Sequence, residues 1–438
     1  GIDFNLGFHV RSYHLDLNYR VGPNRLEGIA TLQLDNWQDL PSMTLDLSPA
    51  LRVTRVTATG SAGVPVRVAR FRQSGGKLRL AFAQPVPVDT EFSLTIRYAG
   101  TPKPIRSAWG DLGWEELENG ALVASQPVGA PSWFPCDDTP DEKARYEIVV
   151  TTDNPYIVAV NGTLLSKRSS GSRTRWHYRV GHPMASYLAT VQIGEYIQLM
   201  LSEPDATVPV RAWVPPALRD SAHAEFADQQ RMIDVFTELF GPYPFNSYSV
   251  VVTEDELEIP LEAQGLSIFG SNHIQGDHAW ERLIAHELSH QWFGNSLGLA
   301  QWNDIWLNEG FACYAEWLWF EHSANRHATV SAREHYEELR RKPQDLLLSN
   351  PGPRDMFDDR VYKRGALTVH ALRVLLGDDA FFRMLRRYVA AGAHSVVEPV
   401  DLKREVLAAA AEVGVPEADV KQLWYAWLHE KTLPEFPR

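Results

Sequence analysis

Two histidines and two glutamates have the residue types and the spacing of a metal-dependent hydrolytic site. The segment HELSH at 286–290 places His286 and His290 four residues apart, and Glu309 follows His290 by nineteen residues. On a helix, residues four apart lie on one face, so both imidazoles can direct a nitrogen at the same ion. The gap to Glu309 fits a turn and a second helix packed across the first. The pattern predicts a ligand set of two imidazoles and one carboxylate.

This ligand set favours a catalytic zinc ion, because three protein ligands leave a fourth position open for water. Zinc lowers the pKa of such a water to about 7. Glu287 lies beside the first ligand and is the candidate general base. An HExxH match alone also arises by chance on amphipathic helices. The presence of Glu309 within its own motif strongly favours the zinc interpretation, with one ion per chain.

The elements that must position these residues are two helices. Strong helix formers fill residues 279–293, with Asp277 as a candidate N-cap and Gly294 as a plausible stop. Glu316 lies seven residues after Glu309, on the same face of the second predicted helix. It could orient a ligand histidine, or it could be an exposed helical glutamate.

The front and rear halves of the chain have different periodicities. Up to about Val191, short alternating segments such as 13–19, 29–34 and 92–98 are separated by turn signals, which is typical of a β-sandwich or saddle. From Ser221 onward, helical periodicity dominates. We therefore expect a multidomain α+β chain, with an all-β saddle or sandwich domain at 1–200 and a mostly helical domain at 201–438 that carries the predicted metal-binding residues.

Composition and net charge limit the classes of molecule that this chain is expected to bind. The 438 residues carry a formal net charge of −13, which argues against nucleic acid and anionic membranes. An acidic chain suits a substrate with a positive amine, although solubility alone also explains the charge. No apolar run of about eighteen residues predicts a membrane span. The two cysteines, Cys136 and Cys313, indicate no disulfide framework and favour a cytoplasmic location.

Four motifs, in order along the chain, carry a resemblance to a known family. They are FPCDDTP at 134–140, HELSHQWFGN at 286–295, WNDIWLNEGFA at 302–312 and YKRGA at 362–366. With them, the chain resembles the zinc aminopeptidase N family of gluzincin metallopeptidases, over nearly its whole length. The resemblance implies a saddle-shaped β domain followed by a thermolysin-like domain. Many members add further C-terminal domains, and this chain looks like a two-domain version without them.

The resemblance also implies roles for three further residues. Tyr362 matches the family tyrosine that donates to the oxyanion. Glu262 lines up with the glutamate of the family's Gly-x-Met-Glu-Asn motif, which binds the substrate α-ammonium, although the residues around it differ from that motif. Gln126, eight residues before Phe134, matches the position of a second amine contact. From the sequence alone, Tyr362 would be read as a core tyrosine at the start of a helix, and Glu262 as a loop carboxylate.

Together these observations predict a zinc-dependent aminopeptidase acting on peptides with a free N-terminus. His286, His290 and Glu309 would bind the metal, and Glu287 and Tyr362 would be catalytic. Two alternatives remain open. One is an endopeptidase of the thermolysin type, which uses the same metal site without an amine anchor. The other is a non-catalytic peptide-binding module on the same fold. The oligomeric state and the preferred N-terminal side chain do not follow from the sequence.

Overall fold

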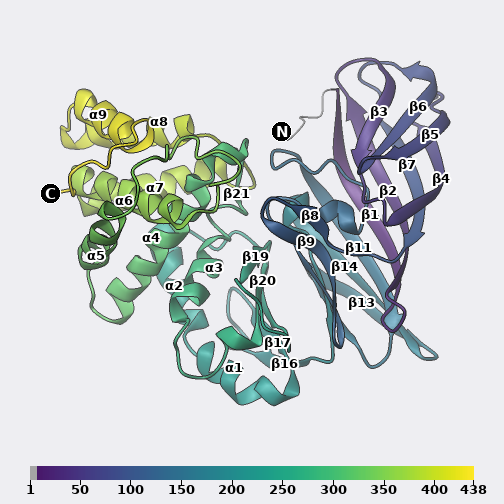
Figure 1. Ribbon diagram of the computed structural model, residues 1–438, viewed down its shortest axis with the longest axis horizontal. Coiled ribbons are helices and arrows are strands. Elements are labelled where there is room, and N and C mark those ends of the chain that lie inside the picture. Colours follow the sequence, from purple (N-terminus) through teal and green to yellow (C-terminus); the bar gives the residue numbers. More distant parts are fainter. Residues whose placement is uncertain (1–6) are drawn as a thin grey trace. The chain divides into compact units, whose positions relative to one another are not determined.

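The computed structural model describes residues 7–438 (Figure 1). Its contacts divide the chain into two compact units. Unit 1 comprises the chain up to Met200 together with Arg211–Ala222 and Phe245–His273. Unit 2 comprises Leu201–Val210, His223–Pro244 and Ile274–Arg438. The chain passes between the units several times, and the single domain boundary near residue 200 stays a prediction.

A seven-stranded sheet dominates unit 1, with the strand order β13-β14-β11-β1-β2-β7-β4. Its neighbouring strands are antiparallel, except that β1 and β11 run parallel. In β1, the side chains of Tyr13, Leu15 and Leu17 are buried while the residues between them reach solvent. This period of two is the alternation that predicts strands here. The bounds are β1 Phe8–Arg20, β2 Arg25–Asn36, β4 Leu51–Gly60, β7 Phe92–Gly100, β11 Lys143–Asp153, β13 Thr163–Ser170 and β14 Arg173–Ala185.

Besides this sheet and the β21–β22 pair described below, the structure of residues 7–438 contains three smaller sheets. The orders are β3-β6-β5, β12-β15-β10-β9-β8 and β16-β17-β18-β20-β19. The bounds are β3 Leu40–Asp46, β5 Val68–Ser74, β6 Lys77–Val86, β8 Ile105–Ser107, β9 Gly110–Leu117, β10 Gly120–Ala124, β12 Ile157–Val160, β15 Val191–Gly194, β16 Ile197–Met200, β17 Val210–Val214, β18 Tyr248–Val252, β19 Leu261–Ala263 and β20 Leu266–Phe269.

Helices make up most of unit 2, drawn from teal through green to yellow in Figure 1. Helix α4 is central: its residues from Trp306 to Trp319 are all buried, and it packs against α3, α5 and α6. A helix that is apolar on all sides belongs in a core. The bounds are α1 Arg219–Glu225, which begins in unit 1, α2 Gln229–Phe240, α3 Glu281–Ser289, α4 Trp306–Ser323, α5 Ala328–Arg340, α6 Asp359–Leu376, α7 Asp378–Gly392, α8 Pro399–Val413 and α9 Glu417–Leu428. Strand β21 Leu297–Leu299 pairs with β22 Ser395–Val397.

The β-rich front half and the helical rear half are confirmed, with local differences from the sequence predictions. The helical periodicity that begins at Ser221 corresponds to two helices, α1 and α2, because turn bonds from Ala227 N to the Ala224 carbonyl and from Gln229 N to the Phe226 carbonyl separate them. The helix expected at 279–293 is α3, which begins at Glu281 and ends at Ser289. Trp280, not Asp277, is its N-cap. Within residues 7–438, no helix is long and apolar enough to cross a membrane.

Candidate active site

Helix α3, with His290 as its C-cap, and helix α4 bring His286, His290 and Glu309 to one point in unit 2. The two Nε2 atoms lie 3.1 Å apart. The Glu309 Oε2 atom lies 3.1 Å from the Nε2 of His286 and 3.2 Å from that of His290. The three side chains are buried. Residues from two helices thus converge on one small volume.

The hydrogen bonds on the far side of each imidazole determine where its lone pair points. The Nδ1 of His286 donates to Glu316 Oε2 at 2.7 Å, and the Nδ1 of His290 donates to the Phe293 carbonyl at 2.9 Å. With each proton on Nδ1, both Nε2 lone pairs face the same point, beside a carboxylate oxygen. Such an arrangement is repulsive unless a proton or a metal cation lies between the three atoms.

The geometry of these residues fits a zinc ion. Tetrahedral ligands about 2.0–2.1 Å from zinc lie roughly 3.4 Å from one another. The three observed separations are 3.1–3.2 Å. Small movements of side chains would open the site to that spacing. Two imidazoles and a carboxylate are a usual donor set for catalytic zinc.

The electrostatics of the site also suit a cation. Burial lowers the pKa of His286, but hydrogen bonds with Glu309 and Glu316 outweigh it and hold this pKa well above its usual value. Burial raises the pKa of Glu309, yet the charge of His290 and the bonds from both histidines bring it below its usual range. A divalent cation would therefore replace a proton on His286 and leave the carboxylates ionised.

Two other glutamates complete the buried cluster. Glu287 lies on α3 next to His286 and is 4% exposed. Glu316 lies two turns after Glu309 on α4, and the two carboxylates contact opposite nitrogens of the His286 ring. Of the two interpretations of Glu316, the exposed helical residue is wrong, because Glu316 is 5% exposed and bonded to His286.

Tyr362 reaches this cluster from the first turn of α6. Its ring stacks on that of His286, with centroids 6.1 Å apart and planes 14° from parallel. The side chain is half-buried. The structure thus brings Tyr362 to the same place as the histidines, although 76 residues separate it from His286 in the sequence.

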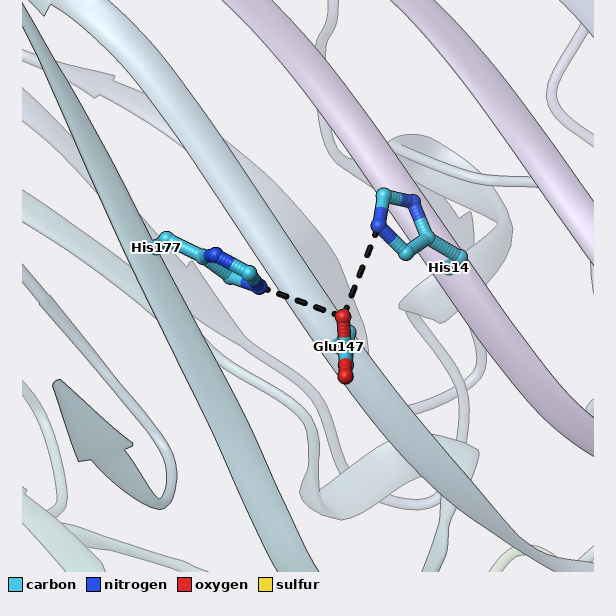
Figure 2. Close-up of side chains that lie close together, drawn as sticks. All are labelled: His14, Glu147 and His177. Carbon is cyan, nitrogen blue, oxygen red and sulfur yellow. Dashed lines mark hydrogen bonds and ion pairs between the residues drawn. The ribbon is translucent and has the colours of Figure 1, made fainter. Parts of the chain in front are cut away.

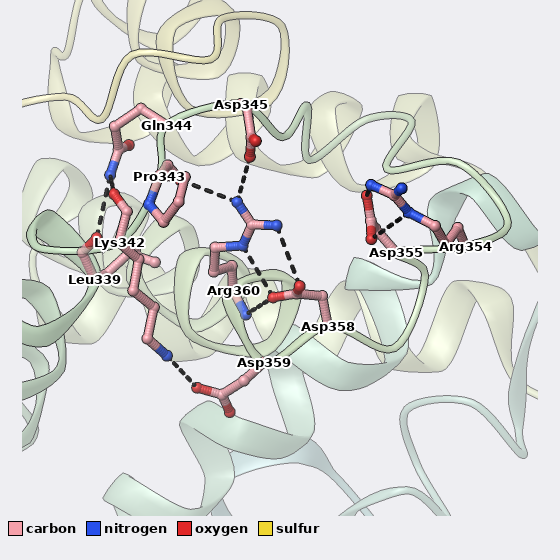
Figure 3. Close-up of polar contacts among 10 residues, drawn as sticks. All are labelled: Leu339, Lys342, Pro343, Gln344, Asp345, Arg354, Asp355, Asp358, Asp359 and Arg360. Carbon is pink, nitrogen blue, oxygen red and sulfur yellow. Dashed lines mark hydrogen bonds and ion pairs between the residues drawn. The ribbon is translucent and has the colours of Figure 1, made fainter.

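Polar contacts hold the start of α6 in place (Figure 3). Asp358 caps the helix by accepting from the Arg360 backbone N–H at 2.9 Å. The Arg360 guanidinium donates hydrogen bonds to both carboxylate oxygens of Asp358, at 3.0 and 3.1 Å, and also to Asp345 and the Pro343 carbonyl. Lys342 pairs with Asp359 at 3.3 Å. This network orients the helical turn that carries Tyr362.

The turn after α3 contains a contact that the residue pattern does not predict. The Phe293 carbonyl accepts from His290, and the Phe293 ring stacks on Phe311 of α4 with centroids 4.5 Å apart. Gly294 follows at φ +120°, where a Cβ would lie 3.4 Å from His290 Nδ1 and 3.2 Å from Asn308. The residue pattern does not indicate which backbone carbonyl accepts a hydrogen bond, and it predicts for Gly294 only the end of a helix.

Glu262 and Gln126, the two predicted amine contacts, meet in unit 1. The Gln126 Nε2 donates to Glu262 Oε1 at 2.8 Å, across 136 residues of sequence. Glu262 is 6% exposed on β19 and lines a small pocket with Ser125 and Tyr187. Bonds from Gln264 N to the Leu188 carbonyl, and from Asn161 to the Gln264 carbonyl, hold β19 against the β structure.

Comparison with known proteins identifies the family. Residues 9–188 match the Peptidase M1 N-terminal domain, and residues 224–427 match the Peptidase family M1 domain. The chain belongs to peptidase family M1. Aminopeptidase B of Mus musculus is 27% identical over 87% of this chain, and the match spans 63% of that protein. Leucine aminopeptidase 2 of Coccidioides immitis is 25% identical, over 98% of this chain and 72% of that protein.

Comparison with solved structures shows that the similarity covers the whole fold of this chain. The M1 zinc metallopeptidase of Deinococcus radiodurans, as a mutant bound to a Tyr-Ser-Ala substrate, has a TM-score of 0.86 and 28% identity. The match covers 99% of this chain and 96% of that one. A two-domain M1 zinc metallopeptidase mutant bound to L-arginine has a TM-score of 0.85, with the same identity and coverage. The resemblance to a two-domain family member is thereby confirmed.

Proposed function

We propose that this chain is a zinc-dependent aminopeptidase, which hydrolyses the first peptide bond of peptides with a free N-terminus. The observation that carries the proposal is the convergence of the two imidazole Nε2 atoms and the Glu309 carboxylate on one point. This arrangement supports one zinc ion per chain, held by His286, His290 and Glu309. The matches to aminopeptidases and zinc metallopeptidases support the same activity.

In this proposal, Glu287 and Tyr362 handle the proton and the developing charge. Bound zinc would supply a Lewis acid that activates water at neutral pH. Glu287 takes a proton from the attacking water and delivers it to the leaving amine. The Tyr362 phenol donates a hydrogen bond to the oxyanion of the tetrahedral intermediate, an interaction worth on the order of 2.7–4 kcal/mol in such sites. The stacking of Tyr362 on His286 supports this role.

Glu262 and Gln126 are proposed to recognise the substrate's α-ammonium. A buried carboxylate binds an ammonium through a charge-assisted hydrogen bond. The amide oxygen of Gln126 can accept a second bond, without adding charge. The hydrogen bond between the two side chains supports a shared function, because it holds the carboxylate in one orientation. Pro260 next to this segment has no backbone N–H to offer a substrate.

The test is the hydrolysis of a free alanyl arylamide and of its N-acetylated counterpart, with and without a chelator. An aminopeptidase should hydrolyse only the free amine, lose activity to the chelator, and recover it with zinc. Equal rates on both substrates, or cleavage within an acetylated peptide, would instead indicate an endopeptidase. Zinc binding without any hydrolysis would indicate a peptide-binding module.

The cellular location remains a proposal as well. Cys136 and Cys313 are both buried and both free thiols. Free buried thiols are compatible with a reducing compartment, which favours the cytoplasm.

A further inference from the structure

Three side chains with metal-binding chemistry gather on the sheet of unit 1, outside the proposed active site (Figure 2). They are His14 on β1, Glu147 on β11 and His177 on β14. These three strands are neighbours in the sheet, with β11 in the middle. His14 lies directly opposite Glu147 in the parallel β1–β11 pair, and His177 lies two residues from Arg179, the partner of Glu147 on β14. Strand alternation puts all three on the solvent-facing side.

Both imidazoles direct their Nε2 atoms at the same oxygen. The distance to Glu147 Oε2 is 3.5 Å from His14 and 3.1 Å from His177. The three candidate ligand atoms all lie within 4.8 Å of one another. These separations bracket the roughly 3.4 Å expected between the tetrahedral ligands of zinc. Little rearrangement is needed for one ion to contact all three side chains.

The surroundings determine which ion fits and how tightly it binds. Imidazole nitrogens favour zinc, copper or nickel over magnesium or calcium. The side chains of His14, Glu147 and His177 are 46%, 37% and 22% exposed, so water can complete the coordination shell. Arg145 and Arg179 are exposed on the same side of β11 and β14. Their positive charge opposes a cation, so binding should be weaker here than at the buried site.

We propose that His14, Glu147 and His177 form a second, exchangeable site for a divalent transition-metal ion. The sheet preorganises the site, because each ligand is fixed by a paired strand and not by a loop. An ion held there links three neighbouring strands, and it therefore stabilises unit 1. The proposal is independent of the catalytic function, since it involves none of the proposed active-site residues.

The experiment titrates zinc-loaded enzyme with additional Zn²⁺ by calorimetry, and with one equivalent of Cu²⁺ for electron paramagnetic resonance. The wild type should bind about one further equivalent, and the copper spectrum should show coupling to two imidazole nitrogens. A double variant, His14→Gln with His177→Gln, should weaken this binding at least about tenfold. The control His223→Gln removes an exposed histidine on α1 and should bind as the wild type does.

Arylamide hydrolysis by the double variant checks that it is folded and keeps its catalytic metal. Two results would overturn the proposal. One is a wild type that binds no metal beyond the first equivalent, which would leave the three side chains as hydrogen-bonded pairs only. The other is a folded double variant that binds the second equivalent as tightly as the wild type does.

Discussion

Two glutamates of helix α4 contact His286, one at each nitrogen of the imidazole ring. Glu309 and Glu316 lie seven residues apart on α4, so they face the same side and reach opposite edges of the imidazole. The HExxH motif and Glu309 are enough to predict the ligand set from the sequence. The role of Glu316 could be suggested by spacing but not decided, because the same spacing also describes an exposed helical face.

Replacing Glu316 should weaken metal binding without removing a ligand. In Glu316→Gln, the His286 Nδ1–H loses its charged acceptor. The orientation of the imidazole is then less fixed, and the basicity of its Nε2 atom is lower. We expect zinc affinity to fall about 10- to 100-fold, measured by competition with a chromophoric chelator. The control Glu238→Gln changes an exposed glutamate of α2 and should have no effect. An unchanged affinity in Glu316→Gln would exclude a positioning role.

His370 makes the stability of unit 2 sensitive to acid. Burial, aided by the charge of Arg373, lowers the pKa of His370 to about 4. In the unfolded chain, this histidine takes up a proton near pH 6.5, while in the folded state it stays neutral until about pH 4. The stabilisation is therefore complete above pH 6.5 and is lost as the pH falls through this window.

We expect His370 to account for about 1–2 kcal/mol of the unfolding free energy lost between pH 7 and pH 5. Urea unfolding at these pH values should show a smaller loss in His370→Gln than in the wild type. The exposed His223→Gln variant should keep the full loss. A His370→Gln variant with the wild-type pH dependence would show that His370 is not the group responsible.

At the scale of elements, tertiary contacts override the local pattern around α3. Helix formers continue to residue 293, yet the helix ends at Ser289. The chain then turns, with Asn295 N bonded to the His290 carbonyl and Phe293 packed on Phe311. Glycine at 294 permits this turn at φ +120°. The spacing of the histidines needs only one helical turn, so the site could be predicted even though the helix end could not.

A pair of glycines sets the distance between α4 and α6. A Cβ at Gly365 would lie 2.8 Å from the Gly310 Cα, and a Cβ at Gly310 would lie 2.8 Å from the Gly365 carbonyl carbon. In both cases the added Cβ would contact backbone atoms of the other helix, so neither contact can be relieved by moving a side chain. Gly310 follows Glu309, and Gly365 follows Tyr362 by three residues. The close crossing therefore places the tyrosine against the metal-binding cluster.

The variant Gly365→Ala should push α6 away from α4. We expect a loss of about 1–3 kcal/mol in unfolding free energy, as for other overpacked cores. We also expect kcat for arylamides to fall while the zinc content is unchanged, because Tyr362 moves and the ligands do not. Gly22→Ala, where nothing lies within 4 Å, is the matched control. Wild-type stability and kcat in Gly365→Ala would contradict this account.

At the scale of the whole molecule, the sequence predicts the change from strands to helices but not which residues belong to each compact unit. Alternation identifies the long strands, because one face of each is buried. Strands of three residues, such as β8 and β19, are too short to show a period. Residues 245–273 belong to unit 1 although they follow two helices. The Glu262–Gln126 contact spans 136 residues, and only the family resemblance suggested that these two residues share a role.

Metal removal should affect one unit more than the other. Zinc present at about a thousand times its dissociation constant stabilises the folded state by about 4 kcal/mol. In calorimetry of the His14→Gln variant, where only the buried site should bind, a chelator should lower one transition by about 10 °C. That transition should carry only part of the unfolding enthalpy. A chelator that shifted the entire endotherm equally would contradict the expectation that metal removal affects one unit more than the other.

The most direct test of the central claim compares zinc content and arylamide hydrolysis in the wild type and in Glu287→Gln. The account predicts about one zinc ion per chain in both proteins. It also predicts a kcat lower by about 10²–10⁴-fold in the variant, because the general base is gone while the metal ligands remain. A zinc-loaded Glu287→Gln enzyme with wild-type activity, or a variant that loses its zinc together with its activity, would contradict it.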